Sequence, residues 1–227
     1  MKTLIGVIQS EANLNCQSTW IENLKKLRGE YEVLVVENSY DDNNFEMLKT
    51  VFKHVLKGPY FNSVKERIIE NRNIVLSWFR KHEQYDKLLF LDSDIFPPAS
   101  ALQSLINSKK KIVGTVCWVV GKAGTLRVAW NFFKEDVMVG KSEDWMAGVE
   151  ENKNYVKEDA KIVKVEDMGL GCTLFDGAML RKESDISFRE NGIALNEDYT
   201  FLRDLSKKGY GIFMDMKVNC FHDVSKY

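Results

Sequence analysis

Short apolar runs and helical periods alternate along the first half of the chain. Uninterrupted apolar runs, each bounded by polar residues, predict buried strands at 4–8, 32–37, 87–91 and 112–119. Apolar positions at helical spacing predict helices at 17–28, 44–56, 63–81 and 97–108. Repeated strand–helix–strand units cross over with a right-handed sense, so we expect a parallel sheet with helices on both faces.

Two of these helices carry apolar stripes that would face the sheet. In the helix at 44–56 the stripe consists of Phe45, Leu48, Phe52 and Val55. In the helix at 63–81 it consists of Val64, Ile68, Val75 and Phe79. Residues at this spacing share one side of a helix, so each stripe predicts a face packed on the core.

Beyond residue 119 the pattern becomes irregular, and glycine, aromatic and charged residues are intermixed. Hairpin strands are expected near 126–139 and 161–166, a helix at 196–208, and short final strands at 211–214 and 218–221. The acidic segment 140–160, which contains Trp145, is read as a flexible excursion or a short helix. We therefore expect an α/β fold in a single domain, with a mostly parallel central sheet flanked by helices and a smaller mixed sheet. Its regular half is 1–119 and its irregular half is 120–227.

Composition narrows the class of protein. The formal net charge of the 227 residues is −1, which argues against a nucleic-acid binder because such proteins carry a basic excess. No run of about 18 apolar residues occurs, so no transmembrane segment is predicted. The first apolar run is too short for a signal peptide and reads as a strand. The four cysteines form no Cys-x-x-Cys pair, which fits buried thiols in a reducing compartment and makes the cytoplasm the expected location.

Two carboxylates end the predicted strand at 87–91, because Leu91 is followed by Asp92-Ser93-Asp94. Residues two apart on an extended chain point to the same side, so Asp92 and Asp94 can converge where open α/β sheets bind ligands. Such close carboxylates repel unless a cation lies between them, and their oxygens suit Mg²⁺ or Mn²⁺. The alternative is that the two acids only terminate the strand.

Polar residues also follow the second strand and occupy the long helix. Glu37, Asn38 and Asp42 could bind a ribose or a base edge, although an ordinary turn with Asp42 as a helix cap would look the same. Arg72 could clamp a pyrophosphate, because its guanidinium is permanently charged. The alternative for Arg72 is a solvated helix face that pairs it with Glu66 or Glu70.

The last third of the chain contributes two further candidates. Glu197 and Asp198 open the helix at 196–208, where a carboxylate could act as a general base. Acids in a first helical turn also favour the helix dipole, which explains them without any catalysis. His222 follows the last apolar strand and could complete a metal site with Asp92 and Asp94. A structural histidine is the alternative.

In this order, the segments resemble the glycosyltransferases of the GT-A fold, most closely those of the family-2 type. The resemblance covers nearly the whole chain and rests on the following stretches: Val36 to Asp42, Arg72-Asn73, Tyr85 to Asp94, Gly169 to Phe175 with Met179 to Lys182, and Glu197 to Tyr210 followed by His222. The second strand of the family usually ends in Asp-Asp-x-Ser, where this chain has Glu37-Asn38-Ser39.

The resemblance implies a glycosyltransferase that uses Mn²⁺ or Mg²⁺. It would move a sugar from a UDP- or GDP-linked donor to a hydroxyl group of a glycan, glycoprotein or lipid-linked acceptor. Residues 1–119 would form the donor half and 120–227 the acceptor half. An inverting reaction is expected, and a retaining one is the alternative.

The resemblance also implies roles for individual residues. The donor would be bound by Gln9, Ser10, Glu37, Asn38, Asp42, Arg72, Asp92 and Ser93. The metal would be bound by Asp92, Asp94 and His222. Asp198 would be the catalytic base, and Trp145 and Glu197 would lie on the acceptor side, although Trp145 could instead pin its segment to the core.

Two readings from other classes remain. One is a GT-A domain that binds a nucleotide sugar without turnover, against which the presence of the acids and His222 counts. The other is a phosphohydrolase with an Asp-x-Asp nucleophile. Such enzymes usually carry that motif at the first strand with Gly-Thr after it, whereas here the motif follows the later strand at 87–91 and Ile95-Phe96 come after it.

Overall fold

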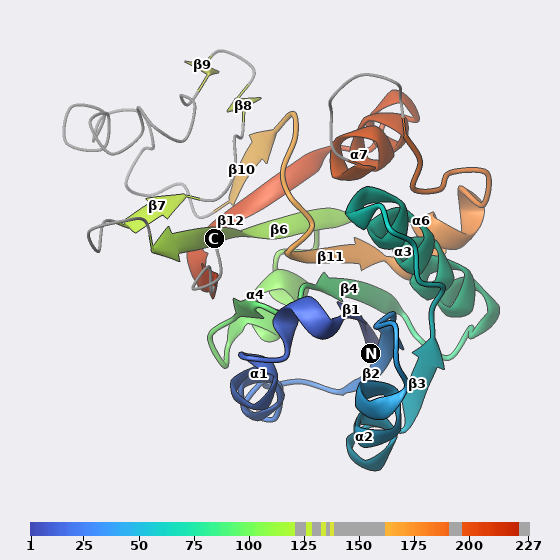
Figure 1. Ribbon diagram of the computed structural model, residues 1–227. Coiled ribbons are helices and arrows are strands. Elements are labelled where there is room, and N and C mark those ends of the chain that lie inside the picture. Colours follow the sequence, from blue (N-terminus) through green and yellow to red (C-terminus); the bar gives the residue numbers. More distant parts are fainter. Residues whose placement is uncertain (121–125, 129–132, 135–136, 139–161, 191–196, 223–227) are drawn as a thin grey trace.

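The computed structural model describes residues 1–120, 126–128, 133–134, 137–138, 162–190 and 197–222. Within these ranges one sheet of ten strands runs through the molecule in the order β10-β12-β6-β11-β4-β1-β2-β3, with β5 paired to β12 and β7 to β6 (Figure 1). Its strands are β1 (Thr3–Gln9), β2 (Tyr31–Glu37), β3 (His54–Lys57), β4 (Lys87–Leu91), β5 (Ile95–Phe96), β6 (Ile112–Val120), β7 (Leu126–Val128), β10 (Ile162–Val165), β11 (Cys172–Asp176) and β12 (Ile212–His222). A separate ribbon pairs β8 (Phe133–Lys134) with β9 (Val137–Met138).

Helices cover both faces of this sheet (Figure 1). They are η1 (Glu11–Asn13, a short 3-10 helix), α1 (Gln17–Leu24), α2 (Asn43–Val51), α3 (Val64–Lys81), α4 (Ala101–Asn107), α6 (Gly177–Lys182) and α7 (Glu197–Lys207). Alternate strand residues enter opposite cores: Leu88 packs with the side chains of α3, α6 and α7, and Leu89 packs with those of α1, α2 and α4. This alternation explains why β4 is an uninterrupted apolar run, since both of its faces are buried.

The predicted parallel core is confirmed for three predicted strands, and β3, which was not predicted, joins them. β3, β2, β1 and β4 are all parallel, and β6 is parallel to β12. Between β4 and β6, however, lies β11, which is antiparallel to both. The sequence analysis predicted neither this strand nor α6. The first four residues of β11 are all buried, as expected for an inserted central strand that is covered on both faces.

Three predicted elements differ from the structure. The helix expected at 44–56 ends at Val51, and β3 follows as an edge strand parallel to β2, so Val55 lies in a strand. Tertiary pairing overrides the helical spacing here, while Phe52 and Val55 still pack against the core. Val64, expected in the apolar stripe of α3, is 60% exposed because it occupies the first helical position. The two final strands are one strand, β12, whose register shifts between Asp215 and Asn219.

Two predictions from composition can be compared with the described residues. All four cysteines lie within them and are buried, and no disulfide joins them. Among the helices of the described ranges, none combines the length and the apolar character that a bilayer crossing requires.

Candidate functional site

The two strand-end carboxylates lie beside the last residue of β12. β4 ends at Leu91, and the chain resumes as β5 at Ile95, which pairs with His222. This pairing brings the imidazole to the acids, and His222 Nε2 lies 3.4 Å from Asp94 Oδ2. The two side chains are 19% and 15% exposed, so both are mostly buried but still reach solvent. The structure therefore places Asp94 and His222 together, as the metal-site hypothesis requires.

Asp92 turns the other way, toward the long helix α3. Arg72 Nη2 donates to Asp92 Oδ1 at 3.3 Å. Burial raises the pKa of the Asp92 carboxyl, Arg72 opposes this, and the neighbouring charge of Asp94 raises the pKa further. The glycine-rich turn allows the close packing, because a Cβ at Gly171 would lie 3.4 Å from Asp92 Oδ2 and 3.2 Å from Ile95 Cγ1.

Arg72 is also the partner of the acids that open α7. Its Nη1 donates to Glu197 Oε1 at 2.8 Å and forms an ion pair with Asp198 Oδ1. Asp198 Oδ2 accepts a hydrogen bond of 3.1 Å from the Leu170 N–H. The Arg72 side chain is only 5% exposed, so it does not lie on a solvated helix face, which was the alternative that its spacing left open.

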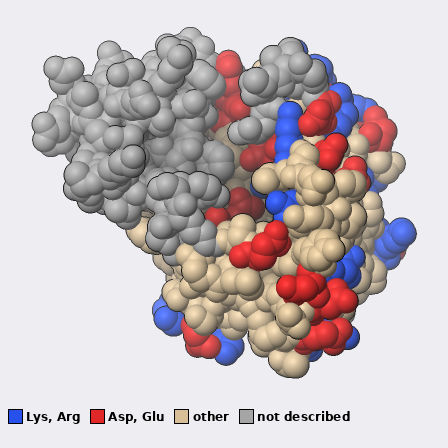
Figure 2. Space-filling model, viewed as in Figure 1, with Lys and Arg blue, Asp and Glu red and all other residues tan. Residues whose placement is uncertain are grey.

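These contacts assemble an acidic centre at the carboxyl end of β4. Acidic side chains line the recessed middle of the face in Figure 2, and Lys and Arg lie beside them. Within the described part of the chain, however, no three His, Cys, Asp or Glu side chains are arranged as a complete metal centre. The arrangement is thus a carboxylate–imidazole pair, Asp94 with His222, next to carboxylates that share one guanidinium.

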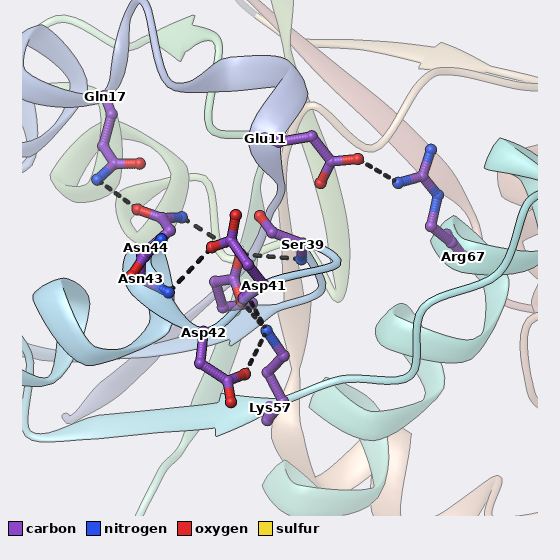
Figure 3. A network of polar contacts seen from close by, with 10 residues as sticks. Glu11, Gln17, Ser39, Asp41, Asp42, Asn43, Asn44, Lys57 and Arg67 are labelled. Carbon is purple, nitrogen blue, oxygen red and sulfur yellow. Dashed lines mark hydrogen bonds and ion pairs between the residues drawn. The ribbon is translucent and has the colours of Figure 1, made fainter.

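The residues after β2 belong to a second polar network, which Figure 3 shows from close by. Glu37 is fully buried, its Oε1 accepts from the Ser39 N–H at 2.9 Å, and its Oε2 accepts from Lys57 Nζ at 3.0 Å. Asn44 bridges Glu37 to Gln17, which in turn accepts from the side chain of Gln9 at 2.6 Å. The carboxylate of Glu37 is therefore committed to contacts that fix the loop.

The other donor candidates occupy different positions. Ser10 caps η1 by accepting from the Ala12 N–H at 3.3 Å, and Ser93 accepts from Asn13 Nδ2 at 2.8 Å. Asp42 is mostly exposed and pairs with Lys57 at 3.0 Å. Asn38 is buried, and its Oδ1 has no hydrogen-bond partner within the described residues. Trp145 lies outside the described residues.

Two tyrosines that the sequence analysis did not assign to the site border this network, together with Arg67, a second candidate for a pyrophosphate clamp in the long helix. Tyr40, 84% exposed, and Tyr60, 41% exposed, pack edge to face with their ring centroids 5.5 Å apart. The Arg67 guanidinium lies 4.9 Å from the Tyr60 ring and pairs with Glu11 at 3.0 Å (Figure 3). Aromatic residues in the loops after β2 and β3 were the available signal. It was missed because the second of these loops was predicted to follow a helix.

Comparisons with known proteins were made by sequence and by structure. No family model matches the chain. It is 32% identical over 92 residues to the galactosylgalactosylxylosylprotein 3-beta-glucuronosyltransferase I of Drosophila melanogaster, a match that covers 39% of this chain and 29% of that protein. The chain thus spans less than a third of the length of this curated relative.

Solved structures match over nearly the whole chain. The TarS 1-349 structure from S. aureus has a TM-score of 0.60 and 18% identity, and the match covers 98% of this chain and 60% of that one. GalNAc-T7, solved with UDP, GalNAc and Mn²⁺, has a TM-score of 0.63 and 10% identity, with 98% and 44% covered. The fold predicted from the sequence is confirmed: the chain has the GT-A fold of the nucleotide-sugar glycosyltransferases.

Proposed function

We propose that the protein is a metal-dependent glycosyltransferase that moves a sugar from a UDP- or GDP-linked donor to a hydroxyl group of an acceptor. The observation that carries the proposal is the meeting of Asp92, Asp94, Glu197, Asp198, Arg72 and His222 at the carboxyl end of β4. In open α/β sheets this is the edge where ligands bind. The curated relative is named as a glucuronosyltransferase, and a solved TarS structure contains UDP, which supports the same class of reaction.

The acidic pair fits a divalent cation on its own chemistry. The pKa of Asp92 is raised by burial, with a further contribution from Asp94, and a cation between two carboxylates removes that repulsion. Asp92, Asp94 and His222 would hold Mn²⁺ or Mg²⁺, which are oxygen-preferring ions that accept an imidazole. When bound, the ion supplies charge compensation for the departing diphosphate. The solved GalNAc-T7 contains Mn²⁺.

The donor would extend from this centre along the ends of β1, β2 and β3. Because the Glu37 carboxylate is committed to Lys57, Ser39 and Asn44, it would act on the donor by holding the loop. The exposed rings of Tyr40 and Tyr60 are better placed to meet a nucleobase, since stacking needs a solvent-facing aromatic surface. Gln9, Ser10, Asn38, Asp42 and Ser93 stay predictions as donor contacts.

Asp198 would accept the proton of the attacking hydroxyl in an inverting reaction. Its first oxygen is paired with Arg72 and its second accepts from the Leu170 N–H, so the side chain is held in one orientation. The Arg72 guanidinium places a positive charge beside Asp198, and Glu197 binds the same guanidinium. A retaining reaction remains the alternative, and the role of Trp145 on the acceptor side remains a prediction.

The proposal also covers the roles of the two halves of the chain, the class of acceptor and the cellular location. Residues 1–119 would bind the donor and 120–227 would supply the acceptor side within one domain. The acceptor would be a glycan, a glycoprotein or a lipid-linked sugar, and the expected location is the cytoplasm.

The proposal is tested by incubating the protein with single UDP- and GDP-sugars, with Mn²⁺ or with EDTA. A thermal shift with one donor, followed by metal-dependent release of the nucleoside diphosphate, is expected. No shift and no release with any donor would contradict the proposal. A phosphohydrolase would instead release inorganic phosphate.

A second candidate is a domain that binds nucleotide sugars without turnover. It is favoured by one observation, namely that both oxygens of Asp198 already have protein partners. A donor-dependent thermal shift without release of nucleoside diphosphate, even with a panel of acceptors present, would support this candidate.

A further inference from the structure

A cavity of about 570 Å³ lies beside α7, apart from the acidic centre. Its walls come from the end of β10, the turn that follows, one side of α7, and the turn between α7 and β12. The polar and aromatic residues of its lining are Lys164, Glu166, Asp167, Tyr199, Arg203 and Tyr210. None of them belongs to the predicted site.

Helical spacing explains how α7 supplies one wall. Phe201, Leu202 and Leu205 are buried in the core, whereas Tyr199, Arg203 and Ser206 recur four and three residues apart and line the cavity. The helix ends at Lys207, and Gly209 in the turn that follows has a φ of +89°, a left-handed conformation that favours glycine; a Cβ there would meet nothing within 4 Å. The turn therefore leaves the cavity open.

Two aromatic rings of the lining are held in place. The Arg203 guanidinium lies 5.8 Å from the centroid of Tyr199, and the Tyr210 hydroxyl donates to Glu183 Oε1 at 2.7 Å. Fixed aromatic rings offer flat apolar surfaces at small entropic cost. The apolar face of a pyranose ring can pack on such a surface, while its hydroxyl groups remain available for hydrogen bonds.

Asp167 provides an acceptor for such hydrogen bonds. Its Oδ1 accepts from the Met168 N–H at 2.8 Å. Asp167 forms no ion pair with any of the residues that the structure describes. Burial raises the pKa of this carboxyl to about 6. A desolvated carboxylate without a cation is destabilising, so a hydroxyl donor from a ligand would be bound favourably.

The charges of the lining residues favour a neutral ligand over an anionic one. Lys164 and Arg203 balance Glu166 and Asp167, so the cavity carries no net charge. An anionic ligand such as a phosphate or a second nucleotide would meet two carboxylates, whereas a neutral sugar meets both donors and acceptors. Aromatic surfaces combined with a few charged groups are typical of small-molecule sites.

The cavity shares its walls with segments that hold the proposed base. Tyr199 directly follows Asp198 on α7. Asp167 lies three residues before Leu170, and the Leu170 N–H donates to Asp198. The cavity therefore adjoins the segments that hold Asp198, although Tyr199 and Asp198 themselves point to different sides of α7.

We propose that this cavity is a subsite for a neutral oligosaccharide, in which Tyr199 packs on a sugar ring and Asp167 and Arg203 bind its hydroxyl groups. The proposal rests on the proposed function in so far as the oligosaccharide is the acceptor. On this proposal the acceptor is a neutral glycan. The cavity binds those of its sugar units that are remote from the reacting hydroxyl group.

The test measures oligosaccharide binding without nucleotide or metal. The probes are maltotriose, cellotriose, chitotriose and mannotriose, with trigalacturonic acid as an anionic counterpart, and binding to the full chain is followed by saturation-transfer NMR and titration. One or more neutral trisaccharides should bind more tightly than the anionic one. Tyr199→Ala and Asp167→Asn should each weaken that binding by about tenfold, and Tyr199→Phe, which keeps the ring, should restore most of it.

Glu22→Gln, which changes an exposed acid on α1 that pairs with Lys25 and does not line the cavity, is the matched control and should bind as the unmodified protein does. Binding of no neutral trisaccharide, or binding that Tyr199→Ala and Asp167→Asn leave unchanged in folded protein, would overturn the proposal. Because nucleotide is absent, the outcome is separate from that of the proposed function. If trisaccharides bind but no nucleotide sugar does, the cavity is a glycan site and the glycosyltransferase assignment is wrong.

Discussion

Arg72 Nη1 lies 2.8 Å from Glu197 Oε1, although 125 residues of sequence separate the two. The contact joins the buried side of α3 to the first turn of α7. The same guanidinium also reaches Asp92 and Asp198, so one cation neutralises acids from both halves of the chain. The donor and acceptor sides of the proposed reaction centre are therefore coupled through Arg72.

Replacing this cation should destabilise the fold. Arg72→Met leaves the buried Glu197 and Asp198 and the half-buried Asp92 without their common partner, and removing one member of a buried ion pair costs about 3–5 kcal/mol. We expect a loss of this size in the free energy of unfolding, measured by urea denaturation. Arg28→Met, at an exposed position, should change it by less than about 0.5 kcal/mol. Equal losses in the two variants would contradict the role of Arg72.

Asp94→Asn should abolish the metal dependence of nucleotide binding. The substitution keeps the shape of the side chain but removes the charge that holds the cation. Titration calorimetry with UDP and GDP should show that Mn²⁺ strengthens binding to the unmodified protein and not to the variant. Asp185→Asn should behave like the unmodified protein. Equal nucleotide affinity in Mn²⁺ and in EDTA, before any substitution, would show that the metal assignment is wrong.

His222→Ala should weaken Mn²⁺ affinity by about tenfold or more and leave metal-free stability nearly unchanged. The reason is its position 3.4 Å from Asp94 Oδ2, where it can add a nitrogen ligand. His54→Ala is the matched control, because His54 pairs with Glu32 in another part of the sheet. A large loss of stability with unchanged Mn²⁺ affinity would identify His222 as structural.

Asp198→Asn should lower turnover by about 10²-fold or more while nucleotide binding stays intact. The amide cannot accept the proton of the attacking hydroxyl. Turnover is measured as release of nucleoside diphosphate, and NMR of the product gives its anomeric configuration. Asp204→Asn, on the same helix and paired with Arg189, is the control. Near-normal turnover of Asp198→Asn, or a product that retains the donor configuration, would remove Asp198 from this role.

Asp167 should make stability depend on pH in a defined direction. Burial raises its pKa from 3.8 to about 6, so the folded state binds the proton more tightly than the unfolded chain does. Its contribution to stability is therefore present below about pH 4 and is lost as the pH rises to about 6. Relative to the unmodified protein, Asp167→Asn should gain up to about 3 kcal/mol between pH 4 and pH 7, at 1.36 kcal/mol per pKa unit.

The pH effect is measured by denaturation of both proteins across this range. Lys164, Glu166, Tyr199 and Arg203, which face the same cavity, are present in both, so their titration cancels in the difference. A difference that does not change with pH would show that Asp167 is solvated. Bound trisaccharide should reduce the difference, because a hydroxyl donor stabilises the carboxylate.

The sequence by itself determined the strands at 4–8, 32–37 and 87–91 and the helices at 63–81 and 196–208. It also determined that Asp92 and Asp94 follow a buried strand. These features depend on local periodicity, which is 2 for strands and 3.6 for helices, and on the alternation of Leu88 and Leu89 between two cores. The order of these elements predicted an α/β fold with a parallel sheet, and the resemblance of the motifs to the GT-A family supplied the prediction of the GT-A fold.

Only the tertiary structure decided which distant segments meet. β11 lies between β4 and β6 because strand pairing is non-local, and β3 forms where a helical stripe was expected because an open edge of β2 was available. The buried ion pairs of Arg72 and the committed carboxylate of Glu37 likewise depend on partners that come from other elements. Spacing along one helix or strand fixes the direction of a side chain, whereas its partner is fixed by the packing of the whole sheet.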